Sequence, residues 1–156
     1  MSNVNCKKRG FSLLELLVAL AILALSIGSV VIFLRNQLLG NLEGDAQIIA
    51  ARLGEAQTRA ITTIGGYSWG VHFDNSSTAP FYAIFPGTVY SAPSSTYYLS
   101  TYIEFQTPAA ATATDIVFNK LNGTIATTTS IVINLKTATS SKKTITVTSQ
   151  GQISVQ

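Results

Sequence analysis

The chain has 156 residues, of which 47% are hydrophobic and only 11% are charged, against about 25% charged residues in an ordinary soluble domain. This length is that of one domain with an anchoring segment, and the single cysteine, Cys6, excludes a disulfide framework within the chain. The net charge of +3 comes from the basic leader at residues 7–9, because the other seven cations balance the seven carboxylates. The net positive charge is therefore weak support for nucleic-acid binding.

Near its start the chain passes from a basic leader through Gly10 into an apolar run at residues 11–34. A helix over this run would be about 36 Å long, enough to cross a hydrocarbon core of about 30 Å. Its only charge is Glu15, and a carboxylate in such a run costs about 2.5–3.5 kcal/mol on insertion scales. The sequence therefore predicts that Glu15 has a partner.

Three interpretations of this region compete. In the first it is an ordinary signal peptide cleaved after Ala21, although the apolar run is long for one and contains a charge. In the second it is a single-pass anchor whose basic leader stays in the cytoplasm, which leaves Glu15 unexplained. The third explains both the length and the charge.

The nine residues Lys-Lys-Arg-Gly-Phe-Ser-Leu-Leu-Glu at 7–15 resemble the class III signal of type IV prepilins and type II secretion pseudopilins. The resemblance implies that a prepilin peptidase cuts between Gly10 and Phe11 at the cytoplasmic face of the inner membrane and that Phe11 is then N-methylated. It further implies that Glu15 pairs with the new α-amino group of a neighbouring subunit in a filament. Such a pairing is physically sensible, since opposite charges attract strongly at low dielectric and either one alone is penalised.

Residues 35–64 show the pattern of an amphipathic helix. Apolar residues recur every three or four positions at Leu42, Ala46, Ile49, Leu53, Ala56, Ala60 and Ile64. Glu55 and Arg59 are spaced for an i,i+4 ion pair on the polar side. We therefore expect one helix over residues 11–64, stopped by Gly65 and Gly66, with its second half packed on a sheet.

From Tyr67 onward the spacing of apolar residues changes from the helical period of 3.6 residues to the strand period of 2. A half-buried strand is predicted at 67–73, followed by strands at 81–85, 97–105 (one or two), 115–118, 131–135, 144–148 and 152–155. A loop is predicted at 108–114, and turns at 138–143 and 149–151. The predicted fold is α+β and pilin-like, with a leader at 1–10, a transmembrane and assembly segment at 11–34, an amphipathic segment at 35–64 and an antiparallel β head at 65–156. Phe118, Asn122-Gly123-Thr124 and Gly151 before Ile153 resemble the GspH/FimT class of minor pilins and pseudopilins.

The head offers few groups for chemistry. The single histidine, His72, precedes Asp74 on the same strand face, a pair that is more often part of a solvated edge than of a catalytic triad. One histidine and one leader cysteine cannot form a zinc site. The sequence therefore predicts no metal, no cofactor and no enzyme activity.

Two lysines provide an alternative function. Lys142 and Lys143, in the predicted turn, with Lys136 and Lys120, could contact DNA phosphates as in some minor pilins of the FimT kind. Paired lysines in a turn equally serve to keep a sheet edge soluble. We predict a minor pilin or pseudopilin subunit of a type IV pilus or type II secretion filament; the alternatives are a DNA- or surface-binding minor pilin and a plain membrane-anchored β domain.

Overall fold

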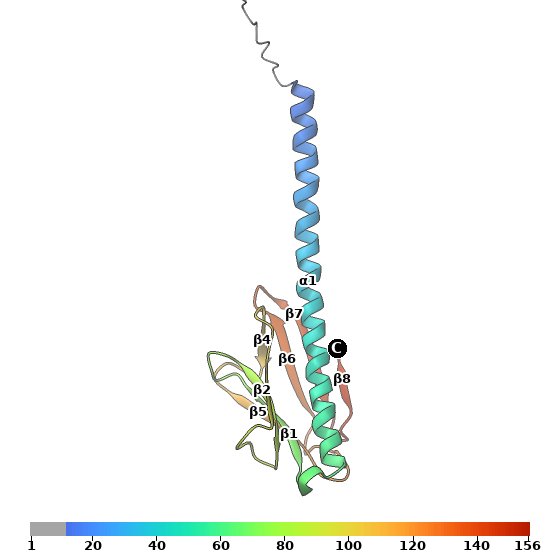
Figure 1. Ribbon diagram of the computed structural model, residues 1–156, viewed down its shortest axis with the longest axis vertical. Helices are drawn as coiled ribbons and strands as arrows, with labels where there is room; N and C mark the ends of the chain where they lie inside the picture. The colour runs from blue at the N-terminus through green and yellow to red at the C-terminus, as the bar shows by residue number, and fades with distance from the viewer. Residues whose placement is uncertain (1–11) are drawn as a thin grey trace, which may run out of the picture. The chain divides into compact units, whose positions relative to one another are not determined.

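The computed structural model describes residues 12–156, apart from the side chains of residues 27–35 (Figure 1). The leader with Cys6, the predicted junction of Gly10 and Phe11, and the side chain of Arg35 lie outside the described residues. The chain divides into two compact units, Met1–Gln37 and Leu38–Gln156, each of which is described by itself.

The first unit contains the start of helix α1 (Leu13–Ile61). Every side chain of residues 12–26 is exposed, and Leu13, Leu14 and Leu25 are each more than 70% accessible. Glu15 lies in the first turn of α1, where the helix dipole favours a carboxylate. Within the described residues, no helix combines the length and the apolarity required to cross a membrane.

In the second unit α1 buries the face that the sequence predicts. Six of its seven predicted core residues are at most 2% exposed: Leu42, Ala46, Ile49, Leu53, Ala56 and Ala60. The seventh prediction is wrong, because α1 ends at Ile61 and Ile64 begins a short 3-10 helix, η1 (Ile64–Gly66), where it is 51% exposed. Thr63 adopts a left-handed conformation (φ 52°) and the N–H of Leu121 donates to the carbonyl of Ala60, so the helix is terminated before the glycines.

The head contains two antiparallel four-stranded sheets (Figure 1). The first has the order β3-β2-β1-β5, with β1 (Trp69–Asp74), β2 (Phe81–Pro86), β3 (Ser95–Tyr98) and β5 (Ala113–Phe118). The second has the order β4-β6-β7-β8, with β4 (Ile103–Thr107), β6 (Thr129–Leu135), β7 (Ala138–Val147) and β8 (Ile153–Val155). The α+β class is confirmed, although the sequence pattern did not predict that the head divides into two sheets that share one core with α1.

Strand β1 differs from its prediction as a half-buried strand. Its residues from Trp69 to Phe73 are all buried, so both faces of the strand are covered. One face packs into the core with α1, and on the other the ring of His72 stacks against Tyr90 of the loop after β2. Alternation of apolar and polar residues predicts that one face of this strand is exposed to solvent. In the structure the loop after β2 covers that face.

The hairpin of β6 and β7 also differs from its prediction. Residues 138–143 were predicted to form a turn, but they belong to β7, and Lys136 and Thr137 alone connect it to β6. Lys142 and Lys143 pair with Asn134 and Ile133 of β6, whereas residues 139–141 lie where the register of the two strands shifts. The polar run Thr-Ser-Ser-Lys-Lys is half-exposed, and polar side chains fit such a strand face. Similarly β5 begins at Ala113, within the predicted loop at 108–114, because Ala113 pairs with Asp74.

Candidate functional site

The N-terminal part of α1 places one carboxylate on an apolar helix surface. Glu15 is exposed, as are its neighbours Leu14 and Leu16, which are 72% and 57% accessible. Gly10 and Phe11, the predicted processing residues, lie outside the described residues. This part of the helix therefore offers an apolar surface with a single charge in its first turn.

The structure separates the two lysines that were considered for DNA binding. Because neighbours on a strand point to opposite faces, Lys142 and Lys143 of β7 do not share a surface. Nζ of Lys143 lies 2.5 Å from the Glu43 carboxylate of α1, and this hydrogen bond lowers the pKa of Glu43. Lys142 is exposed, and Lys136 donates from Nζ to the carbonyl of Thr101. Lys143 thus connects β7 to α1 rather than extending a basic patch.

A polar cluster surrounds His72 on the central part of the first sheet. Nδ1 of His72 lies 2.5 Å from Oδ1 of Asp115 on β5, and Nε2 lies 3.9 Å from Oδ2 of Asp74. The imidazole also stacks on Tyr90, with ring centroids 3.8 Å apart and planes within 4°. The hydroxyl of Ser76 donates to Asp74 and holds the pKa of that carboxyl below its usual value, while burial raises the pKa of the Tyr90 phenol.

This cluster holds a loop rather than presenting a nucleophile. Each ring nitrogen of His72 faces a carboxylate, so neither is directed at a hydroxyl as an acyl-transfer triad requires. His72 is also only 8% exposed, because β1 is an inner strand of the sheet and not the solvated edge that the sequence suggested. In the described part of the chain, no group of three or more metal-binding side chains could hold an ion. Sequence spacing identified Asp74 but gave no signal for Asp115 or Tyr90, which are brought in by the register of β5 and by the loop.

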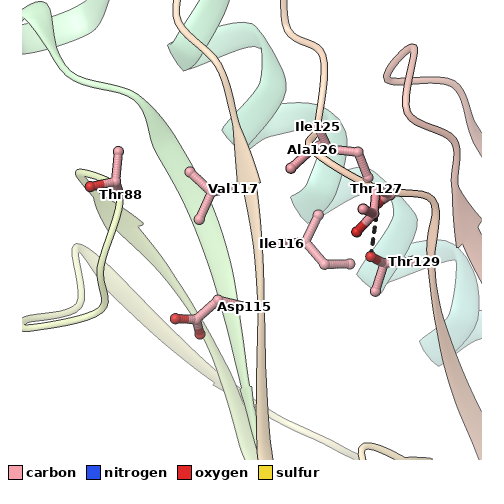
Figure 2. Close-up of a pocket in the computed structure, with 8 residues that line it drawn as sticks. All are labelled: Thr88, Asp115, Ile116, Val117, Ile125, Ala126, Thr127 and Thr129. Carbon is pink, nitrogen blue, oxygen red and sulfur yellow. Dashed lines mark hydrogen bonds between the residues drawn. The ribbon is translucent and has the colours of Figure 1, made fainter.

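A hollow of about 290 Å³ lies along β5 (Figure 2). Figure 2 shows Asp115 and Val117 on one side of the strand and Ile116 on the other, pointing toward the segment that leads into β6. The lining residues are Thr88, Asp115, Ile116, Val117, Ile125, Ala126, Thr127 and Thr129. The hollow thus follows the outer edge of the first sheet and has hydroxyl groups on both walls. The sequence analysis did not predict it, because its walls come from segments that are distant in the chain.

Comparisons with known proteins agree with this architecture. Residues 5–31 match the family model described as the prokaryotic N-terminal methylation motif. The crystal structure of the type IV minor pilin FimU of Pseudomonas aeruginosa is similar at 17% identity, covering 74% of this chain and 92% of FimU with a TM-score of 0.52. This chain has a pilin-like fold.

A second FimU crystal form matches this pilin-like chain at 15% identity, covering 75% of this chain and 89% of FimU with a TM-score of 0.55. The minor pseudopilin EpsH of the type 2 secretion system of Vibrio cholerae matches at 15% identity, covering 74% of this chain and 96% of EpsH with a TM-score of 0.54. Among curated proteins, none matches the pilin-like chain in sequence. Identities at this level concern the fold, which is shared with minor subunits of both kinds of filament.

Proposed function

We propose that this chain is a minor subunit of a type IV pilus or a type II secretion filament. Prepilin peptidase removes residues 1–10 by cutting between Gly10 and Phe11, and Phe11 becomes the N-methylated first residue. Glu15 then pairs with the α-amino group of a neighbouring subunit. The chain acts as a structural component and as the substrate of an enzyme, not as an enzyme.

The observation that carries this proposal is the exposed apolar surface of residues 12–26, which lies within the methylation motif matched at residues 5–31. A helix surface of leucine, isoleucine and valine in water is strongly unfavourable, at roughly 25 cal/mol per Å². Such a surface requires lipid before assembly and other apolar helices afterwards. A filament built from related subunits supplies the second environment.

The proposed location follows from charge and from the order of the segments. Lys7, Lys8 and Arg9 keep the N-terminus in the cytoplasm. Residues 11–34 then anchor the chain in the inner membrane, residues 35–64 continue the helix outside it, and the β head at 65–156 is extracytoplasmic. Assembly transfers the subunit from the membrane into the filament.

Mass spectrometry of the N-terminus tests the processing step. The full chain is expressed in a host with prepilin peptidase and in a matched host without it. We expect a mature chain that begins with methylated Phe11 only in the first host. Gly10→Val should block cleavage in that host, because a branched side chain crowds the scissile backbone, whereas Ser12→Ala should be processed normally. A chain that begins after Ala21, or one that is uncut in both hosts, would contradict the proposal.

A further inference from the structure

Strand β5 carries a backbone edge without a neighbour. Among residues 12–156 it is the outer strand of the first sheet and pairs only with β1. The N–H of Asn75 donates to the carbonyl of Thr112 (3.0 Å), which continues the hydrogen-bond ladder between β1 and β5. This bond determines which residues of β5 hydrogen-bond to β1 and which point away from it. Since hydrogen-bonded and non-bonded pairs alternate in antiparallel sheets, Ile116 bonds to β1, whereas the N–H and C=O groups of Asp115 and Val117 point away from it.

The hydrogen bonds of β1 with β2 support this assignment. The N–H of Gly87 donates to the carbonyl of Ser68 (2.7 Å), which assigns the even-numbered residues of β1, Gly70 and His72 among them, to bonds with β2. Its odd-numbered residues are then left for β5, as the first argument requires. Among the described residues, no segment outside β1 forms a backbone hydrogen bond with Asp115 or Val117.

A second free edge borders the same hollow. β4 pairs with β6 only as far as Val132, so in the part of the chain that the structure describes the first residues of β6 pair with β7 alone. The N–H of Lys136 donates to the carbonyl of Tyr102 (3.0 Å), which directs the even-numbered residues of β6 toward the β4 side. The backbone of Ser130 therefore faces the open side beyond the end of β4. Thr129, its neighbour, lines the hollow opposite β5 (Figure 2).

We propose that the β5 edge accepts an extended segment of another protein chain as an additional strand. Regularly spaced, unpaired N–H and C=O groups are what a β-strand pairs with, and a small molecule would not match them. The hollow along the edge provides room on both faces of β5 for the side chains of the incoming strand.

Charge and side-chain alternation specify the chemistry of that segment. Oδ1 of Asp115 is engaged by His72, and its side chain remains 34% exposed, so its second oxygen can accept from a lysine or arginine on the incoming strand. The residue opposite Ile116 would point to the core side, toward Ile125, and should be apolar. The residue opposite Val117 shares the outer face with the basic residue, where a β-branched side chain fits. The stacked pair of His72 and Tyr90 holds Asp115 in position for this contact.

The proposal is tested by panning a displayed library of random linear peptides. The peptides have about ten residues, which is the upper length of ordinary strands. The target is the full chain in detergent micelles. We expect enrichment of peptides that alternate β-branched and apolar residues around one lysine or arginine. A synthetic peptide of the enriched sequence should protect the amides of Asp115 and Val117 from hydrogen exchange.

Two variants make the result decisive. Val117→Pro removes one outward N–H without breaking the β1 ladder and should weaken peptide binding about tenfold or more, whereas Val117→Thr keeps the N–H and should bind as the wild type does. If Val117→Pro lowers the melting temperature, Thr127→Trp fills the hollow without a backbone change and should give the same loss. Absence of enrichment, equal binding to all variants, or pairing of β5 between two copies of this chain would overturn the proposal.

Discussion

Replacing Gly151 with alanine is expected to lower the free energy of unfolding of the head by about 3–5 kcal/mol. Gly151 has φ +85°, a conformation that costs an L-residue about 1 kcal/mol or more. A Cβ atom there would lie 2.2 Å from the carbonyl oxygen of Gly123 and 2.5 Å from Nε2 of Gln57. The first of these atoms belongs to the backbone, so relief requires movement of a loop.

The loss is large because Gly151 is part of a bridge between α1 and two turns of the head. Nε2 of Gln57 donates to the carbonyls of both Gly123 (3.0 Å) and Gly151 (2.8 Å). A methyl group at 151 displaces that amide and leaves two partly buried carbonyls without their donor, at about 1–3 kcal/mol each when no water replaces it. Gln57→Ala removes the same donor without the collision and should cost less than Gly151→Ala.

Thermal unfolding of the full chain in detergent, followed by circular dichroism, measures the effect. For a domain of this size 3–5 kcal/mol corresponds to a fall of roughly 10–20 °C in Tm. Gly66→Ala is the matched control, because Gly66 also has a left-handed φ (+77°) but nothing lies within 4 Å of the added Cβ. It should cost only the conformational part, about 1 kcal/mol. Equal losses at both positions would show that the bridge contributes nothing.

The helix was the most predictable element, because its signal is local. Spacings of three and four residues between Leu42 and Ala60 report the buried face directly, and the ion pair between Glu55 and Arg59 forms as its i,i+4 spacing predicts. The end of the helix was not predictable from glycines alone. It depends on Leu121, which reaches Ala60 from a loop sixty residues later in the chain.

The head was less predictable wherever burial depends on distant segments. Alternation of apolar and polar residues predicts a strand with one face exposed to solvent. This prediction is wrong for β1, because Tyr90 stacks on His72 and covers that face. The polar residues before Lys143 resembled a turn because turns and exposed strand faces have similar compositions. What distinguishes them is the pairing of Lys143 with Glu43, a contact between elements a hundred residues apart. The hollow along β5 depends in the same way on where β4 stops pairing with β6.

Replacing Glu15 with alanine is expected to leave processing intact and to reduce incorporation into the filament by about a hundredfold or more. In the proposed assembly, the Glu15 carboxylate faces the methylated α-amino group of a neighbouring subunit among apolar helices. Removing one member of a buried ion pair leaves the other charge uncompensated, which costs about 3–5 kcal/mol, and each 1.4 kcal/mol is a factor of ten. In the membrane, by contrast, loss of the carboxylate removes an unfavourable charge, so the variant should remain anchored.

Quantitative mass spectrometry of sheared filament and membrane fractions separates these effects, since the same sample reports the N-terminal residue and its methylation. Ser12→Ala is the matched control, because Ser12 is also exposed near the start of α1 but is uncharged. Glu15→Gln distinguishes charge from hydrogen bonding: it retains a polar side chain of the same length but should resemble Glu15→Ala if the charge is what pairs. Normal incorporation of Glu15→Ala, with Phe11 correctly methylated, would refute the pairing while leaving the processing proposal intact. Loss of processing would instead place Glu15 in the contact with the peptidase.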